Sequence, residues 1–263
     1  MQVTVNGSPV EYHVAGYGEP VLFVHAFPLN SQMWQPQVEH VSRGYKTVVL
    51  DLPGFGESPP AQEAPTMFSY VETVAAVLEA AQVDQPAVLV GLSMGGYILL
   101  EFFRRFPERV RALVLADTRA APDTEEARQN RLDTAEQVLQ EGPRVLVESM
   151  VPKLLTSRAD DVVRLRVREM IFAATREGIA GALRAMAARP DSRPTLETIT
   201  VPTLVIVGGQ DDLTPPAEAE GMAQAIAGAE LEVIEGAGHL SNLERQDAFN
   251  AALLRFLDDL GSS

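Results

Sequence analysis

Short hydrophobic runs alternate with longer amphipathic stretches along most of this chain. Six of the runs have the apolar and β-branched character of buried strands, and they occupy residues 21–24, 47–50, 87–90, 112–115, 204–207 and 231–234. Buried-type strands separated by helical patterns are typical of an α/β fold, in which helices cover both faces of a mostly parallel sheet. We therefore expect a parallel sheet with helices on both faces.

The first residues follow a different pattern. Two short strand-like runs, 3–5 and 10–14, flank the turn-forming pair Asn6-Gly7. A pair of this kind between two strands predicts a hairpin, so the sheet should begin with antiparallel strands. This makes eight strands in all, and the later six end near Gly, Asp or His. Ligands bind outside the carboxyl ends of such strands, which is where we look for chemistry.

The strand pattern disappears between residues 120 and 194. Helical periodicity replaces it over 125–141, 144–155 and 160–188. We interpret this region as a helical cap over the strand ends. The predicted organisation is a core domain of residues 1–119 and 195–263 with a cap insertion of residues 120–194.

Composition narrows the possible partners and compartments. The chain has 263 residues, 46% of them hydrophobic and 22% charged, as in ordinary globular proteins, and its net charge of −15 argues against nucleic acid and anionic membranes. It has no cysteine, which excludes disulfides and thiolate chemistry. No signal peptide or membrane-spanning run is evident, so we expect a cytoplasmic monomer or homodimer.

A candidate nucleophile lies in the sequence Gly-Leu-Ser-Met-Gly, residues 91–95, directly after the strand-like run 87–90. A helix-forming stretch follows, which is the strand–turn–helix setting of a nucleophile elbow. In such a turn the serine has a strained backbone, and the flanking glycines allow helix and strand to approach closely. Without this context the string would be a weak signal; with it, Ser93 is the predicted nucleophile.

A serine nucleophile needs a base and a carboxylate that orients the base. Of the four histidines, His239 lies in a glycine-rich loop after the last strand, where Ser241 or Asn242 could cap the next helix. Asp211 and Asp212 follow the preceding strand, and only one of these neighbours can point at His239. The order Ser, Asp, His is the one described for α/β-hydrolases.

The oxyanion formed during attack needs preorganised donors. We expect one from the backbone N–H of Met94, directly after the nucleophile. The second should come from the loop after the strand 21–24, where we choose the N–H of Phe27 because Pro28 has none. His25 in this loop should order the loop and border the substrate pocket rather than act as the base.

Together these motifs make the chain resemble the α/β-hydrolase superfamily over nearly its full length. The matching segments are the elbow at Ser93 and residues 25–28, 51–58, 211–215 and 238–239. The resemblance implies that Asp211 is the catalytic acid, with Asp212 as the alternative, and that Asp51 belongs to a structural turn. Ala26 departs from the pattern, since many relatives have glycine there.

Within the family the chain resembles carboxylesterases, 3-oxoadipate enol-lactonases and cofactor-free haloperoxidase or perhydrolase-type enzymes. Relatives that are dehalogenases or epoxide hydrolases have Asp as the nucleophile, whereas Ser93 indicates acyl transfer. The resemblance therefore implies hydrolysis of a small ester or lactone, without metal or organic cofactor. A C–C bond hydrolase and a non-catalytic ligand receptor on the same fold remain alternatives.

The substrate pocket is the least determined part of the sequence. Apolar residues of the cap and of the segment after the first buried strand could line it, although the same residues could equally form core. These are Trp34, Met150, Met170, Phe172 and Met186. A cap arginine could bind a substrate carboxylate if it faced inward, although a solvated helix face is the simpler interpretation; the candidates are Arg164, Arg166, Arg168 and Arg184.

Overall fold

The computed structural model describes residues 1–261, which form one eight-stranded sheet with the order β1-β2-β4-β3-β5-β6-β7-β8. The pairs β1–β2 and β2–β4 are antiparallel and all other pairs are parallel. The strands are β1 (Gln2–Val5), β2 (Ser8–Ala15), β3 (Pro20–Val24), β4 (Lys46–Leu50), β5 (Ala87–Leu92), β6 (Val110–Ala116), β7 (Thr203–Gly208) and β8 (Glu230–Ile234).

This sheet confirms the predicted fold class, including the antiparallel start. Asn6 and Gly7 have φ values of 47° and 79°, as a tight hairpin turn between β1 and β2 requires. Strands β3, β5 and β7 are buried along their whole lengths because helices cover both faces of the sheet. Their near-continuous apolar sequences follow from this double coverage.

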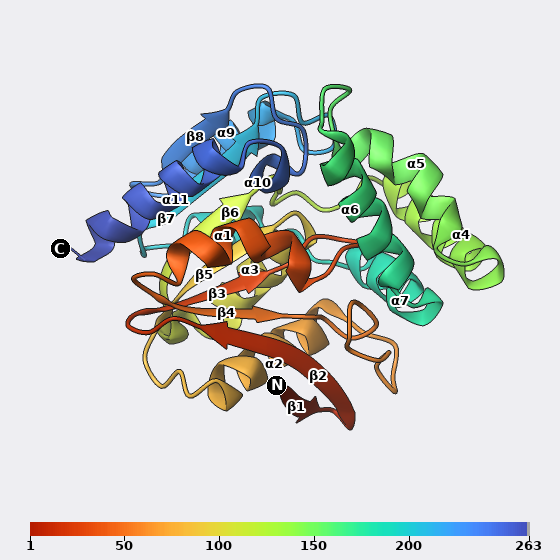
Figure 1. Cartoon of the computed structure of the whole chain (residues 1–263), viewed down its shortest axis with the longest axis horizontal. Helices are drawn as coiled ribbons and strands as arrows, with labels where there is room; N and C mark the ends of the chain where they lie inside the picture. Colours follow the sequence, from red (N-terminus) through yellow and green to blue (C-terminus); the bar gives the residue numbers. More distant parts are fainter. Residues whose placement is uncertain (262–263) are drawn as a thin grey trace.

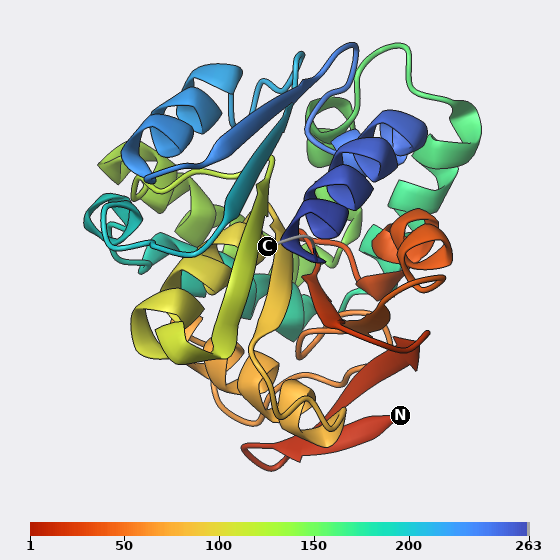
Figure 2. The ribbon, with the colours of Figure 1, turned by 90° about the vertical axis from the view of Figure 1, so that its left-hand side faces the viewer.

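Two helical layers enclose the sheet, as Figure 2 shows with the sheet seen from its side. One layer consists of α1 (Gln35–Val41), α10 (Ser241–Glu244) and α11 (Gln246–Gly261). The other consists of α2 (Met67–Ala80), α3 (Met94–Arg105), α8 (Arg193–Leu196) and α9 (Pro216–Ala225). Two short 3₁₀ helices, η1 (Ser31–Trp34) and η2 (Pro107–Arg109), complete these connections.

Four helices between β6 and β7 lie together beside one end of the sheet (Figure 1). They are α4 (Glu125–Glu141), α5 (Arg144–Leu154), α6 (Asp161–Ala173) and α7 (Arg176–Ala187). The Thr175 N–H donates to Gly54 O at 2.9 Å, and the Leu240 N–H donates to Leu154 O at 3.1 Å. Because Gly54 follows β4 and Leu240 follows β8, these helices contact loops at the carboxyl ends of the strands.

The continuous helical stretch expected over residues 160–188 is wrong, because the structure divides it into α6 and α7. Ala174 between them is extended, and Thr175 is the N-cap of α7, with its hydroxyl accepting from the Gly178 N–H at 3.0 Å. The same hydroxyl donates to Gly54 O at 3.0 Å. Contact with the loop after β4 therefore breaks the helix at a position that local periodicity does not reveal.

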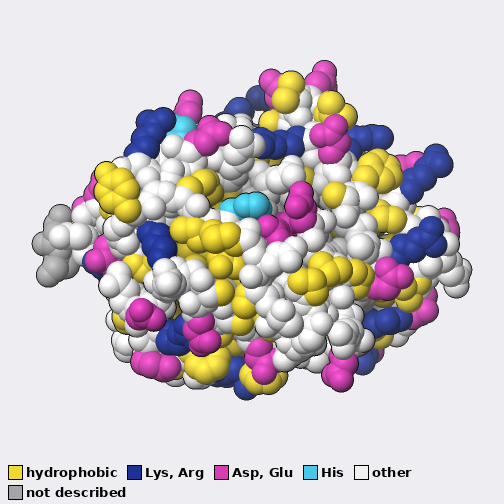
Figure 3. Space-filling model, turned by 60° about the horizontal axis from the view of Figure 1, so that its bottom comes forward, with side chains coloured by type: hydrophobic (Ala, Val, Ile, Leu, Met, Phe, Trp, Pro, Cys, Tyr) yellow, Lys and Arg dark blue, Asp and Glu magenta, His cyan; other side chains and the backbone are white. Residues whose placement is uncertain are grey.

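The surface carries charges of both signs. Figure 3 shows acidic, basic and hydrophobic side chains interspersed over one face, without a continuous basic area on that face. Over residues 1–261 we find no helix with the length and apolarity needed to cross a bilayer.

Candidate active site

The turn after β5 has the strained geometry expected of a nucleophile elbow. Ser93 has φ of 56° and ψ of −112°, a conformation that residues with side chains rarely adopt. A Cβ on Gly91 would lie 2.6 Å from the carbonyl carbon of Gly95, and one on Gly95 would lie 2.3 Å from Val24 O. Both glycines are therefore required by the close approach of α3 to β5 and β3.

Three side chains predicted from the sequence are joined by hydrogen bonds. Ser93 Oγ lies 2.8 Å from His239 Nε2, and His239 Nδ1 lies 2.8 Å from Asp211 Oδ2. His239 and Asp211 are buried, whereas Ser93 is partly exposed. An Nδ1–H that donates to the carboxylate leaves Nε2 free to accept the serine proton.

The structure separates the two neighbouring carboxylates at the end of β7. Asp211 is buried and faces His239, whereas Asp212 is exposed. The Asp211 carboxylate also accepts hydrogen bonds from the N–H groups of Leu213 at 2.8 Å and Thr214 at 3.0 Å. Thr214 Oγ1 adds a third at 2.6 Å to the oxygen that faces His239. These donors orient the carboxylate toward the imidazole.

Burial by itself would raise the pKa of Asp211, but its hydrogen-bond donors and neighbouring charge outweigh this effect. The hydrogen bond and charge of His239 and the two donors of Thr214 lower the pKa of Asp211 below its usual value. The carboxylate is therefore ionised at neutral pH. An ionised carboxylate at this position stabilises an imidazolium that forms on His239.

The two expected oxyanion donors lie at the ends of neighbouring strands. Val24 at the end of β3 is paired with Gly91 near the end of β5, so the loops that carry Phe27 and Met94 are adjacent. Met94 is the first residue of α3, where an N–H has no acceptor within the helix. Among residues 1–261, neither the Phe27 N–H nor the Met94 N–H donates a hydrogen bond to a backbone carbonyl in the loops and turns.

His25 is fully buried, and both of its ring nitrogens are occupied by backbone groups. The Leu52 N–H donates to Nε2 at 3.0 Å, so Nδ1 carries the proton and donates to Ala26 O at 3.0 Å. Burial lowers the pKa of His25, against the opposing effects of the Ala26 bond and the charge of Asp51. A neutral histidine in these contacts connects the loops after β3 and β4.

Asp51 has structural contacts, in agreement with the expectation of a structural turn. Its carboxylate accepts from the N–H of Ser31 at 2.8 Å and from the N–H of Glu57 at 2.9 Å. Gly56 has φ of 55°, and a Cβ there would lie 2.2 Å from the Asp51 carboxylate. The segment 51–58 is thus folded around this carboxylate.

The apolar residues expected in the pocket lie in different environments. Trp34 lies in the core, with its ring 5.2 Å from that of Phe23 and 6.1 Å from that of Phe249. Because Trp34 is also fully buried, its predicted place in the pocket is wrong. Phe172 is 52% exposed on α6, and its place in a pocket stays a prediction. Met170 and Met186 are buried, and Met150 is half-buried.

The expected helix caps after His239 are wrong, because the side chains of Ser241 and Asn242 have other partners. The N-cap of α10 is Leu240. Ser241 Oγ donates to the carboxylate of Asp117, and Asn242 Nδ2 donates to Met33 O at 2.9 Å. These tertiary bonds use the groups that would otherwise cap the helix.

Asp117 is a buried carboxylate that we did not predict, although it follows β6 where chemistry was expected. Besides the bond from Ser241, it accepts from the Gly208 N–H at 2.7 Å. It thereby joins the end of β7, which leads to Asp211, to the loop after His239. Burial and the charge of Asp211 raise the pKa of Asp117 well above its usual value, against the effect of these bonds.

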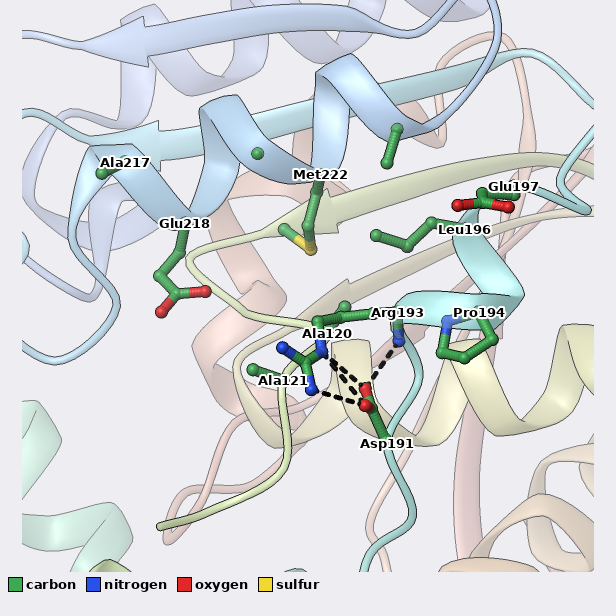
Figure 4. Close-up of a pocket in the computed structure, with 12 residues that line it drawn as sticks. Ala120, Ala121, Asp191, Arg193, Pro194, Leu196, Glu197, Ala217, Glu218 and Met222 are labelled. Atoms are coloured by element: carbon green, nitrogen blue, oxygen red, sulfur yellow. Dashed lines mark hydrogen bonds and ion pairs between the residues drawn. The ribbon is translucent and has the colours of Figure 1, made fainter.

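Figure 4 shows a cavity of about 480 Å³ whose lining does not include Ser93. Its walls come from α8, α9 and residues 120–121, with Met222 and Leu196 among its apolar lining. An ion pair of 2.7 Å between Asp191 and Arg193 borders it. The cavity therefore lies where the segment 120–194 leaves and rejoins the strands. Among residues 1–261, no cluster of three or more His, Asp or Glu side chains could hold a metal ion.

Comparison with known proteins agrees with this geometry. The sequence model of a family described as alpha/beta hydrolase fold matches residues 19–246. A thermophilic esterase from Thermogutta terrifontis has a similar structure, with a TM-score of 0.96 and 38% identity over 99% of both chains. The 3-oxoadipate enol-lactonase 2 of Acinetobacter baylyi is 29% identical over 95% of this chain and 94% of its own. A pimeloyl-[acyl-carrier protein] methyl ester esterase of Neisseria meningitidis is 30% identical over 90% of this chain and 93% of its own.

Proposed function

Because this chain belongs to the α/β-hydrolase fold family, whose sequence model matches residues 19–246, we propose that it is a serine hydrolase that cleaves carboxylic esters through an acyl-enzyme. The observation that carries the proposal is the chain of two 2.8 Å hydrogen bonds that joins Ser93, His239 and Asp211. Relatives named as esterases and as an enol-lactonase support the class of ester-bond hydrolases.

Acylation begins when His239 Nε2 accepts the proton of Ser93 and the serine oxygen attacks the ester carbonyl. Asp211 holds the Nδ1–H tautomer and stabilises the imidazolium. The oxyanion of the tetrahedral intermediate accepts hydrogen bonds from the amides of Phe27 and Met94. His239 then donates its proton to the departing alcohol, which leaves an acyl group on Ser93.

Deacylation repeats these roles with water as the nucleophile. His239 removes a proton from water, the hydroxide attacks the acyl carbonyl, and the oxyanion occupies the same pair of amides. When this second intermediate collapses, His239 returns the proton to Ser93. The acid product leaves and the free enzyme is restored. Every step uses side chains and backbone groups of this chain.

A lactonase is the second candidate, since an enol-lactonase is among the relatives that match nearly the whole chain. The four cap arginines considered for binding a substrate carboxylate offer this alternative little support. Arg164 donates to Thr156 O and Arg184 pairs with Glu136 at 2.6 Å. Arg166 donates to Gln35, and Arg168 is exposed. These contacts give no support to carboxylate binding by Arg164, Arg166 or Arg184.

The test is hydrolysis of p-nitrophenyl esters from acetate to decanoate, with Ser93→Ala as the paired variant. We expect activity that peaks at short or medium chains and falls by about 10⁶-fold in the variant. The length at the peak measures the acyl pocket. Wild-type activity no higher than that of Ser93→Ala would refute the esterase proposal. A panel of neutral and carboxylate-bearing lactones, and a diketone for C–C hydrolysis, would then separate the alternatives.

We also propose that residues 120–194 act as a cap over the site, because their helices contact the loops after β4 and β8. Residues 1–119 and 195–263 would then form the core domain. A non-catalytic receptor is an alternative that the same assays address, and a perhydrolase-type activity is one that the same esters test when hydrogen peroxide is added as the acyl acceptor. The cytoplasmic location and the choice between monomer and homodimer stay predictions.

A further inference from the structure

The residues on both sides of His239 are connected to residues 154–156, one directly and one through Glu244; Leu154 ends α5, and the next two residues begin the loop that leads to α6. On one side, the Leu240 N–H donates to Leu154 O at 3.1 Å. On the other side, the Gly238 N–H donates to Glu244 Oε2 at 2.7 Å. The second oxygen of Glu244 accepts from the Thr156 N–H at 3.0 Å and from Thr156 Oγ1 at 2.6 Å. Glu244 thus bridges the histidine loop and the helical insertion.

The space around this bridge is closely filled. A Cβ on Gly238 would lie 3.0 Å from Glu244 Oε2 and 3.2 Å from both Thr156 N and Thr156 Cγ2. Each of these distances is tighter than ordinary Cβ contacts. Because Gly238 has no side chain, the Glu244 carboxylate and Thr156 can occupy this space. The glycine is thus needed for the bridge as well as for the loop.

The bridge consists of strong interactions. A carboxylate that accepts from three N–H and O–H donors forms charge-assisted hydrogen bonds, which are shorter and stronger than neutral ones. Glu244 is half-buried, so water screens these bonds less than it screens bonds at the surface. One side chain with partners on both sides thus adds to the backbone bonds that hold the loop.

We propose that Glu244 is a positioning residue for the reaction: its carboxylate clamps the His239 loop to Thr156 and thereby holds the imidazole against Ser93. The inference rests on the proposed function, in which His239 is the base. General-base catalysis depends on the distance from base to nucleophile, and a displacement of about 1 Å can cost about 100-fold in rate. Displacing residues 154–156 would therefore move the base.

Four variants test the clamp. Thr156→Val removes the hydroxyl while keeping size and charge, and Thr156→Ser restores it. Glu244→Ala removes the whole bridge. Glu232→Gln is the matched control, since it removes a carboxylate whose partner is Arg255, at 2.9 Å, and which has no part in the clamp. Thermal unfolding of each variant establishes that it is folded.

Two readouts separate positioning of the base from shaping of the pocket. The first is the second-order rate at which a small alkyl fluorophosphonate labels Ser93, which requires the base and little of the pocket. The second is the separation of kcat from KM on the best p-nitrophenyl ester. We expect Thr156→Val to lower the labelling rate and kcat by about 3- to 10-fold and Glu244→Ala by about 10- to 100-fold, with KM nearly unchanged. Thr156→Ser and Glu232→Gln should stay within about twofold of wild type.

The outcomes are distinguishable. Folded Thr156→Val and Glu244→Ala proteins with wild-type labelling rates, or with a change in KM alone, would overturn the clamp and leave the serine hydrolase intact. Failure of the fluorophosphonate to label the wild-type protein would instead overturn the proposed function, and the clamp with it. If Thr156→Ser labelled as slowly as Thr156→Val, the result would also contradict the clamp, because the hydroxyl would then be irrelevant.

Discussion

Thr118 Oγ1 donates a hydrogen bond of 2.8 Å to the backbone carbonyl of Ser93. This bond connects the strained turn after β5, where Ser93 has φ of 56°, to the second residue after the end of the neighbouring strand β6. A Cβ on Gly96 would lie 2.5 Å from the same hydroxyl, so this glycine is needed for Thr118 to reach the turn. The nucleophile is thus held from an adjacent strand as well as by its own helix.

Replacing Thr118 with valine should remove this support. The Ser93 carbonyl would lose the shorter of its two hydrogen bonds and keep the one from the Tyr97 N–H at 3.3 Å, which costs about 0.5–1.5 kcal/mol of unfolding free energy. Urea denaturation of the two proteins measures the difference. Thr118→Ser keeps the hydroxyl and serves as control, and equal loss in both variants would assign the effect to packing instead.

Asp211→Asn and Asp212→Asn should differ greatly although the residues are neighbours. The Asp211 carboxylate bonds to His239 and Thr214. The side-chain amide of asparagine carries no charge there and would favour the wrong imidazole tautomer. We expect kcat to fall by about 10⁴-fold, as for loss of a triad carboxylate. Asp212 is exposed and its variant should keep wild-type kcat. Steady-state kinetics on one ester decide this, and comparable losses in both would reject the assignment of Asp211.

Asp117→Asn should change how stability depends on pH. Burial and the charge of Asp211 raise the pKa of Asp117 in the folded state. A raised folded-state value means that its contribution to stability is complete below the unfolded pKa, about 4, and is lost as pH rises through the folded value. Asparagine does not titrate, and its amide can accept from Gly208 and donate to Ser241.

The stability of Asp117→Asn relative to wild type should therefore increase from about pH 4 toward alkaline pH. Urea unfolding of both proteins at several pH values from about 4 upward measures the difference in their unfolding free energies directly. Parallel curves for the two proteins would mean that the carboxyl has no raised pKa in the folded protein.

Two glycine substitutions should have opposite effects. In Gly95→Ala, the new methyl would lie 2.3 Å from Val24 O, so helix α3 must shift and we expect a loss of about 1–3 kcal/mol with low activity. Gly221 lies within α9, outside the positive-φ region and with no atom within 4 Å of its ideal Cβ. Gly221→Ala should gain about 0.5–1 kcal/mol from helix propensity. Chemical denaturation compares them, and destabilisation by Gly221→Ala would contradict the open environment.

Much of the fold follows from local patterns. All eight strands lie where apolar runs and the Asn6-Gly7 turn predict them. The burial expected for residues 231–234 is wrong, because β8 is an edge strand in which Leu231 and Val233 are exposed. The turn at Ser93 can also be predicted from the sequence, because its two glycines and the strand before it are close together in the chain. The helices α4 and α5 begin at the expected residues, 125 and 144.

Other features depend on which distant residues meet. Adjacent carboxylates have nearly the same local context, so the sequence prefers Asp211 to Asp212 only through the family resemblance. The packing of the loop after β7 brings the Asp211 carboxylate to His239. Trp34 could lie in a pocket or in the core until α11 is packed on it. The break at Thr175 and the bridge from Glu244 to Thr156 join segments 121 and 88 residues apart. Local sequence specifies backbone preference and apolar face; tertiary packing decides which polar groups find partners, because that depends on contacts between residues far apart in the chain.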